Sequence, residues 1–239
     1  MTNRQEPERY LVDCETAKER IPSELIGRGI EDFKFDKDGK VYILKTDFKD
    51  EFEIIKATLD SSQNQEFFEL DEANKLWKVI LKKNPSDTFY HQFIASGVNT
   101  QYPYGKSDAV HRGHYIASNF RKYLVPDQRL SDQSVVNFFG KGNVLNVYPQ
   151  SASSNCNIEM LGQLYYEQKV WEFLDKSVTN KAYYEIENII IGDRKSLGRR
   201  IKAIFLNGDI LDSDYEHFHV FIPNINDGIE IAESEIEPE

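Results

Sequence analysis

The stretch AVHRGHYIASNF, residues 109–120, places His111, Arg112 and His114 within four positions. An imidazole has an unperturbed pKa of about 6.5, so a histidine can take up and release a proton near neutral pH. A guanidinium can hold a phosphate through paired hydrogen bonds, and Gly113 allows a close backbone approach. The stretch is therefore a candidate site for proton transfer, although a packed, structural His114 is the simpler interpretation of this stretch alone.

A second polar stretch, NVYPQSASSN, covers residues 146–155. Its two asparagines, Asn146 and Asn155, are separated by Pro149, Gln150 and a run of serine and alanine. Asn155 stands where the next helix is expected to begin. Its side-chain oxygen can therefore either face a cation or cap that helix, and capping is the ordinary use of an asparagine there.

Residues 158–177 have the periodicity of a helix, and Glu167 lies inside it. One apolar stripe contains Met160, Leu164, Trp171 and Leu174, with Glu167 in the gap where another apolar residue is expected. A carboxylate on a buried stripe is costly unless it has a partner. In the alternative, another set of residues defines the buried face and Glu167 points at water: Tyr165, Val170 and Phe173. Periodicity does not decide between the two.

Taken together, HRGH, NVYPQ, Asn155 and GQLYYEQKVW resemble the DNA/RNA non-specific endonuclease family. These are the ββα-metal nucleases, which include mitochondrial endonuclease G and secreted bacterial sugar-non-specific nucleases. The family carries an Asp-Arg-Gly-His motif, then a strand ending in Asn-x-x-Pro-Gln. An asparagine near a helix start and a glutamate further along that helix follow. The resemblance covers roughly residues 85–225 in order and approximate spacing.

The resemblance implies a role for each matching residue. His114 would be the general base for the attacking water, and Asn155 the single protein ligand of Mg²⁺, with Mn²⁺ as a substitute. Glu167 would orient metal-bound water, Arg112 would contact the scissile phosphate, and Asn146 would hold the geometry of the site. The implied activity is hydrolysis of DNA, and of RNA as a further substrate, to 5′-phosphate ends with little sequence preference.

Two features depart from the family pattern. His111 stands where the family has aspartate, which replaces an acceptor by a possible donor or ligand. The interval from Asn155 to Glu167 is longer than usual by about one helical turn, so Glu159 or Glu172 could take the place of Glu167. The alternative function is therefore a degenerate nuclease fold, or an acidic binding protein that acts without catalysis.

The elements around these residues predict an α+β fold, with a ββα-metal nuclease core on an antiparallel sheet and an N-terminal extension of strands and helix. Residues 33–60 are expected to form short strands with a turn at Asp38-Gly39, and residues 70–84 a helix capped by Asp71. Further strands are expected at 143–150, 182–191, 199–206 and 216–223, with a turn at Asn207-Gly208. Residues 1–30 are polar and are expected to be peripheral.

Three segments follow from this pattern. Residues 1–85 are an extension of unknown role that could bind a protein partner, residues 86–226 are the nuclease domain, and residues 227–239 are an acidic flexible tail. The net charge of −11 counts against a nucleic-acid partner. Residues 101–150 nevertheless contain six basic and three acidic residues, and GDRKSLGRR follows at 192–200, which favours a local basic surface.

The sequence contains no apolar run long enough to cross a membrane, and its first twenty residues lack the apolar core of a Sec signal peptide. Cys14 and Cys156 are too few for a disulfide framework or a cysteine zinc site. The predicted location is the cytoplasm, or the outside of the cell after export by a route other than Sec.

Overall fold

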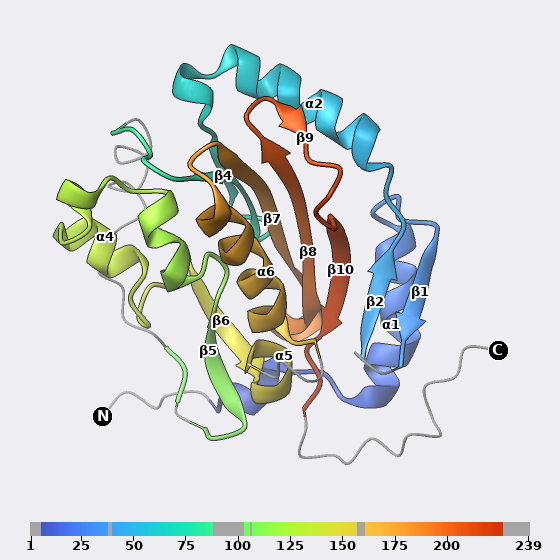
Figure 1. The fold of residues 1–239 in the computed structure, drawn as a ribbon. Coiled ribbons are helices and arrows are strands. Elements are labelled where there is room, and N and C mark those ends of the chain that lie inside the picture. The colour runs from blue at the N-terminus through green and yellow to red at the C-terminus, as the bar shows by residue number, and fades with distance from the viewer. Residues whose placement is uncertain (1–5, 38–39, 88–102, 106, 157–160, 227–239) are drawn as a thin grey trace.

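In this computed structural model the described residues are 6–37, 40–87, 103–105, 107–156 and 161–226. A large antiparallel sheet has the strand order β1-β2-β10-β8-β7-β4-β3, and β9 pairs with β8 (Figure 1). Its strands are β1 (Phe33–Asp36), β2 (Val41–Leu44), β3 (Phe68–Asp71), β4 (Leu76–Lys82), β7 (Asn180–Ile191), β8 (Lys195–Asn207), β9 (Ile210–Leu211) and β10 (Phe218–Pro223). A separate two-stranded ribbon pairs β5 (Val110–His114) with β6 (Val147–Ser151).

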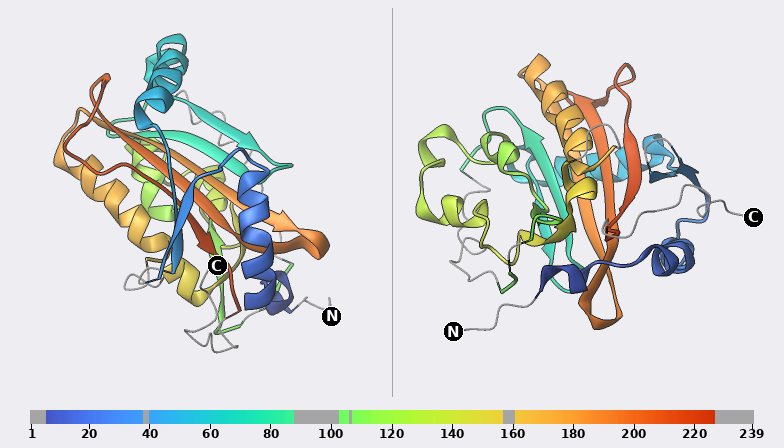
Figure 2. Two further views of the ribbon diagram at one scale, coloured as in Figure 1. Left: turned by 90° about the vertical axis from the view of Figure 1, so that its right-hand side faces the viewer. Right: turned by 90° about the horizontal axis from the view of Figure 1, so that it is seen from below.

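The helices of the described residues lie on both sides of the large sheet (Figure 2). They are α1 (Cys14–Ile26), α2 (Phe48–Ser61), α4 (Gln133–Phe138), α5 (Ala152–Cys156) and α6 (Gln163–Lys176), with short 3₁₀ turns at Pro7–Tyr10, Gln63–Gln65, Ser118–Tyr123, Asp127–Arg129 and Gly192–Arg194. Helices and an antiparallel sheet that occupy separate layers confirm the predicted α+β class.

Successive residues of a strand point to opposite faces of the sheet, and β8 shows this clearly. Ile201, Ala203 and Phe205 belong to the main hydrophobic core, together with the buried residues of α6 and of the segment 115–147. We call the face that carries these three side chains the front face. Because α6 and residues 115–147 cover the front face, the functional residues predicted from the sequence lie on that side (Figure 1).

The opposite face, here called the back face, is covered by two helices at its two ends. Helix α1 packs its buried side chains against Leu197 and Phe221, and α2 packs against Tyr183, Ile204 and Leu206. Because both faces are covered, the residues of the central strands β8 and β10 are almost continuously buried rather than alternately buried and exposed.

The prediction of a helix over residues 70–84 is wrong. These residues form the end of β3, a turn, and β4. Asp71 accepts hydrogen bonds from the backbone nitrogens of Ala73 and Asn74, which closes the turn instead of capping a helix. The apolar run of β4 imitates a buried helix because Trp77 faces the front core and Ile80 faces the back.

The prediction of strands throughout residues 33–60 is right for β1 and β2 and wrong for the rest. Asp47 caps α2 by accepting from Lys49 N and Asp50 N, and the helix buries Phe52, Ile55 and Leu59. The predicted turn residues Asp38 and Gly39 lie outside the described residues. The strands expected near 182–191, 199–206 and 216–223 are confirmed as β7, β8 and β10, and Gly208 makes the expected turn with φ 63°.

The predicted periphery of residues 1–30 is wrong for much of that segment. Val12 is fully buried, and α1 buries Ala17, Ile21 and Leu25. The sheet is continuous across residue 85, because β4 pairs with β7 along its whole length. The division at residue 85 as a functional boundary, and a partner bound by the segment before it, stay predictions. The acidic tail lies outside the described residues.

Within the part of the chain that the structure describes, none of the helices has the length and apolar character that crossing a bilayer requires.

Candidate active site

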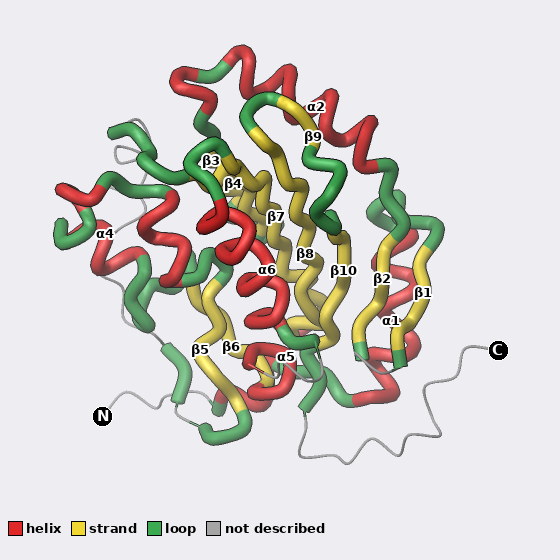
Figure 3. The backbone as a smooth tube through the Cα atoms, in the orientation of Figure 1, coloured by secondary structure: helices red, strands yellow, loops and turns green. Residues whose placement is uncertain are grey.

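The ribbon of β5 and β6 carries the two polar stretches side by side (Figure 3). His111 pairs with Gln150, and His114 with Val147. Helix α5 begins directly after β6 and contacts both strands and α6. The ribbon therefore joins the HRGH stretch, the start of α5 and the first turns of α6 in one corner of the front face.

His114 is largely buried, and its ring is held by one hydrogen bond. Its Nε2 lies 3.0 Å from the carbonyl oxygen of Phe139. A carbonyl oxygen only accepts, so Nε2 carries the proton and Nδ1 keeps its lone pair. Burial lowers the pKa of His114, and the nearby cations Arg199 and Lys141 lower it further. The ring is therefore neutral at neutral pH, with Nδ1 as the basic atom.

Asn146 is completely buried and holds the backbone around His114. Its Oδ1 accepts from Ile116 N at 2.8 Å, and its Nδ2 donates to the carbonyl oxygens of Ile116 and Phe138. These bonds tie the residues after β5 to the end of α4, next to the carbonyl that holds the ring of His114. Asn146 is thus placed to fix geometry rather than to touch a substrate.

The backbone of His114 is held by two side chains from distant parts of the chain. Arg199 donates to the carbonyl oxygens of Gly113 and His114, at 2.9 and 2.5 Å. Gln163 donates to the same His114 oxygen at 2.7 Å and accepts from Arg199 at 2.6 Å. The guanidinium also lies over the ring of Tyr115, 4.7 Å from its centroid.

Gly113 is required by close packing against Gln150. A Cβ on Gly113 would lie 2.1 Å from Gln150 Oε1 and 2.9 Å from Arg199 Nη2. Gln150 Nε2 donates to Ser154 O and to Gln163 Oε1, whereas no described group donates to its buried Oε1. The glycine of HRGH therefore allows β6 and β8 to approach β5.

Glu167 faces inward, so the alternative is wrong in having it point at water, although Val170 and Phe173 are buried as that alternative expected. Of the first stripe, Leu174 is buried, whereas Leu164 and Trp171 are only partly buried. The residue is 7% exposed, and its Oε1 accepts from Gln163 Nε2 at 2.6 Å. Burial raises the pKa of Glu167 to about 7, against the opposing effects of Gln163 and Arg199. Of the two substitutes considered, Glu172 is exposed and accepts from Gln168, and Glu159 lies outside the described residues.

Asn155 is partly buried near the end of the five-residue helix α5, not at the cap of a longer helix. Its Nδ2 lies 3.2 Å from His111 Nδ1 and 3.2 Å from Cys156 Sγ. No described group donates to its Oδ1. His111, in the position of the family aspartate, thus contacts the residue that the resemblance makes the metal ligand.

Arg112 lies in β5 of the ribbon and is partly exposed. Its Nη1 donates to the backbone oxygen of Lys141 at 3.3 Å. Lys141 is exposed and acts electrostatically on His114, so both cations flank the histidine. Tyr104, which precedes the ribbon, is buried against Tyr10 and Tyr148.

The sequence pattern missed Gln163 and Arg199. Arg199 looked like surface charge in the cluster GDRKSLGRR, yet it is 2% exposed. One signal in the sequence could have indicated its burial. Arg199 and Arg200 are successive residues of a predicted strand, so their side chains point to opposite faces, and one of them faces the core. Gln163 precedes Glu167 by one helical turn. The interval from Asn155 to Glu167 is longer than the family spacing by the same amount, so Gln163 stands where that spacing places the glutamate.

Among the described residues there is no group of three or more histidine, cysteine, aspartate or glutamate side chains that could hold a metal ion. Any metal ion at this site would therefore need ligands of other kinds, such as the Asn155 amide and water.

Comparison with solved structures finds the same fold in a nuclease. NucA from Streptococcus agalactiae, crystallised with a magnesium ion, aligns with a TM-score of 0.51 and 17% identity over 85% of this chain and 87% of that one. The metal-free structure of the same protein aligns at 0.48 and 20% identity, over 81% and 83%. The likeness to non-specific nucleases inferred from the motifs is confirmed at the level of the fold.

No family model matches the sequence, and no curated protein matches it significantly.

Proposed function

We propose that this chain, which shares its fold with a nuclease, is a Mg²⁺-dependent endonuclease of the ββα-metal type. It hydrolyses phosphodiesters of DNA, and of RNA as a second substrate, to leave 5′-phosphate ends. The observation that carries the proposal is the state of His114. Its Nε2 is bound to a carbonyl, its Nδ1 is unprotonated, and Asn155 lies on the adjoining helix.

His114 acts as the general base. Its Nδ1 takes a proton from a water molecule while the oxygen of that water attacks phosphorus, and the bond to the 3′ oxygen breaks. The bond from Nε2 to Phe139 O holds the ring in the required tautomer throughout. Because the pKa of His114 is lowered, the base is in its active form at neutral pH without help from a carboxylate.

The residues around Asn155 fit a hydrated magnesium ion. Asn155 Oδ1 has no described donor and the side chain is partly exposed, so one neutral oxygen is offered to solvent. Mg²⁺ prefers oxygen ligands and gives up water reluctantly, so a single protein ligand suits it, and Mn²⁺ can replace it. When bound, the ion supplies charge stabilisation for the phosphate and the departing oxygen.

The remaining site residues bind and position. Arg112 and Lys141 flank His114 and hold the phosphate by charge, which carries no sequence information. Glu167 accepts from Gln163 in the buried first turns of α6, from where it orients water near Asn155. Asn146 keeps Phe139 and His114 in register through its three backbone bonds.

The second candidate is a nuclease fold that binds without cleaving. It is favoured by one contact, in which the ring of His111 accepts a hydrogen bond from Asn155 Nδ2. His111 stands in the position where the family has an aspartate. The net charge of −11 also weakens attraction to phosphates outside the basic segment.

Cleavage of supercoiled plasmid and of structured RNA tests the proposal. We expect nicking and linearisation with Mg²⁺ or Mn²⁺, and none with EDTA. His114→Ala, prepared in the same way, controls for contaminating nucleases. A folded wild-type protein that leaves both substrates intact with every divalent ion would overturn the enzyme and support the binding protein.

A further inference from the structure

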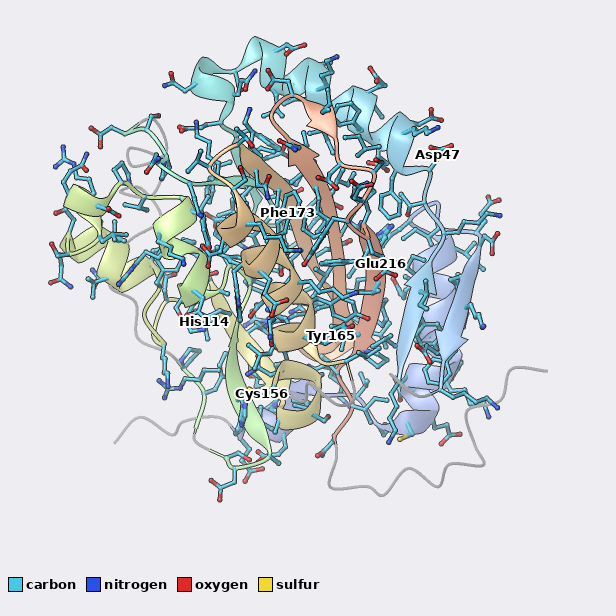
Figure 4. The ribbon with its side chains drawn as sticks, in the orientation of Figure 1. Asp47, His114, Cys156, Tyr165, Phe173 and Glu216 are labelled. Atoms are coloured by element: carbon cyan, nitrogen blue, oxygen red, sulfur yellow. The ribbon has the colours of Figure 1, made fainter. Side chains whose placement is uncertain are left out.

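Three potential ligand atoms meet beside the site: His111 Nδ1, Cys156 Sγ and the Asn155 amide. The imidazole nitrogen and the sulfur are 3.4 Å apart, and Asn155 Nδ2 is 3.2 Å from each. Cys156 lies at the end of α5, beside β5 (Figure 4). The three atoms form a nearly equilateral triangle.

The triangle has the dimensions of one face of a tetrahedral zinc site. With Zn–S about 2.3 Å and Zn–N or Zn–O about 2.0–2.1 Å, tetrahedral angles put sulfur about 3.5 Å from nitrogen and nitrogen about 3.3 Å from oxygen. The spacing between His111 and Cys156 agrees with the first value. Little movement of either side chain is needed for both to bind one ion.

The lone pairs also point the right way. An amide nitrogen only donates, so His111 Nδ1 accepts from Asn155 and is unprotonated on that side. The sulfur of Cys156 accepts from the same amide group. Both lone pairs are therefore aimed at a positive hydrogen, which a cation can replace. A half-turn of the Asn155 amide, about a broad and nearly two-fold torsion, presents Oδ1 instead.

From these contacts we infer that His111, Cys156 and Asn155 form a binding site for a borderline-soft divalent cation of the Zn²⁺ class. The fourth position is open to water, because Cys156 is exposed and the other two side chains are partly exposed. Sulfur and imidazole ligands select Zn²⁺ over Mg²⁺, which prefers oxygen. The thiol proton leaves to solvent as the sulfur binds the ion.

The site has a consequence that rests on the proposed function. Asn155 would then serve two ions, so Zn²⁺ bound with His111 and Cys156 takes the amide oxygen away from Mg²⁺. Zn²⁺ is therefore an inhibitor that acts at the ligand shared by the two sites. The histidine that replaces the family aspartate is, on this account, a ligand of the inhibitory ion.

Binding is tested first with Co²⁺ as a spectroscopic substitute for Zn²⁺ on the full-length protein. We expect the near-ultraviolet thiolate-to-cobalt absorption to saturate at one ion per chain and to be displaced by Zn²⁺. The band is lost in Cys156→Ser and in His111→Ala, and it is retained in Cys14→Ser, the matched control for the other cysteine. Absence of the band in the wild type, or its persistence in Cys156→Ser, would overturn the site.

Inhibition is measured separately, as plasmid cleavage in Mg²⁺ with increasing Zn²⁺. Zn²⁺ is expected to inhibit the wild type and Cys14→Ser at concentrations at least about tenfold below those that inhibit Cys156→Ser. Equal sensitivity of all three would contradict the shared ligand. A protein that gives the cobalt band but cleaves nothing would count against the proposed function and leave the metal site standing.

Discussion

Arg199 and Arg200 are neighbours on β8, yet they lie on opposite faces of the sheet in different surroundings, Arg199 buried and Arg200 partly buried. On the front face, Arg199 binds the neutral oxygens of Gly113, His114 and Gln163. On the back face, Arg200 pairs with the carboxylates of Glu185 and Glu187, at 2.6 and 2.7 Å.

The buried histidines differ in the same way. His219 on the back face has both ring nitrogens bound, with Nδ1 2.7 Å from Thr46 Oγ1 and Nε2 3.1 Å from Arg200. Burial lowers its pKa to about 3, and Arg200 adds to the effect. His114 on the front face has one nitrogen bound and one with its lone pair available.

The buried glutamates complete the contrast. On the front face burial dominates and raises the pKa of Glu167 to about 7. On the back face burial also acts on Glu185, but Arg200 and Lys202 outweigh it and lower its pKa to about 2. The same type of side chain therefore either titrates near neutral pH or stays charged, according to its neighbours.

The back face also holds a cleft of about 930 Å³, lined in part by residues at the ends of α1 and α2. Several of the charges that line it are paired with one another, among them Arg200 with Glu187 and Lys202 with Glu51. The front face instead holds an imidazole nitrogen with its lone pair available, a carboxyl that titrates near neutrality and a Gln150 oxygen to which no described group donates. Charge left available for chemistry, rather than cavity size, distinguishes the two regions.

The largest expected effect separates the two histidines. His114→Ala should lower the rate of Mg²⁺-dependent cleavage by about 10²- to 10⁴-fold, the contribution of a general base, and change the free energy of unfolding little. His219→Ala should do the opposite, because it removes the ring that binds Thr46 Oγ1 and Arg200 Nη1, at a cost of about 1–3 kcal/mol. Initial rates and urea denaturation of both variants check this. Equal losses of activity would remove the contrast.

The two arginines should differ in stability. Arg200→Met removes the guanidinium shared by two buried carboxylates, and leaves Glu185 paired with Lys202 and Glu187 paired with Arg28. We therefore expect the free energy of unfolding to fall by about 3 kcal/mol, the lower end of the range for a broken buried ion pair, with the specific activity of the folded protein unchanged. Arg199→Met takes the guanidinium donor away from neutral oxygen acceptors only, so it should lower the free energy of unfolding by about 1–3 kcal/mol. Because Arg199 holds the backbone of His114, the substitution Arg199→Met should also lower the cleavage rate at least about tenfold. A larger stability loss for Arg199→Met would reverse the assignment of roles.

The two glutamates should give opposite pH dependences of stability. The folded pKa of Glu167 lies above its usual 4.5, so the contribution of this residue to stability is greatest below pH 4.5 and falls by about 3 kcal/mol as the pH rises to about 7. The folded pKa of Glu185 lies below 4.5, so its contribution of about 3 kcal/mol is present above pH 4.5 and is lost as the pH falls to about 2.

Urea denaturation from pH 2 to pH 9 measures both effects. Glu167→Gln should remove the loss of stability toward neutral pH, and Glu185→Gln should remove the loss in acid. If Glu167→Gln left the neutral slope unchanged, its carboxyl would be ionised in the folded protein and the front face would resemble the back.

The smallest expected effect is in the pH dependence of cleavage. His114 must be unprotonated to act, so kcat/KM should fall as the pH falls through its lowered pKa. The acid limb should therefore lie below pH 6.5, the value of an unperturbed imidazole. Steady-state rates between pH 5 and pH 8 test this, and a limb at or above pH 6.5 would show that burial does not act on the ring as described.

The sequence predicted the parts of this contrast that are local. The motifs HRGH and NVYPQ and the residue Asn155 could be identified from the sequence because their order and spacing follow from the two paired strands of the ribbon. The fold class followed from strands with strong β patterns, such as β7 and β8. The strand at 76–82 was mistaken for a helix because burial on both faces removes the alternation that marks a strand. The helix at 48–61 was missed although its buried residues Phe52, Ile55 and Leu59 have helical spacing.

The non-local parts could not be predicted. The roles of Arg199 and Gln163 depend on the packing of β8 and α6 against β5, across 86 and 49 residues of sequence. No spacing rule encodes such contacts. The periodicity of the sequence did not show whether Glu167 is buried. In the structure its carboxylate is buried and accepts a hydrogen bond from Gln163.

The central claim is that His114 and Asn155 act on one phosphodiester in one step. Plasmid cleavage in Mg²⁺ by His114→Ala, Asn155→Ala and the double variant tests it most directly. Groups that act as a unit give non-additive losses, so the double variant should be no slower than the slower single variant. A single variant that cleaves at the wild-type rate, or a double variant whose loss is the product of both, would contradict the account.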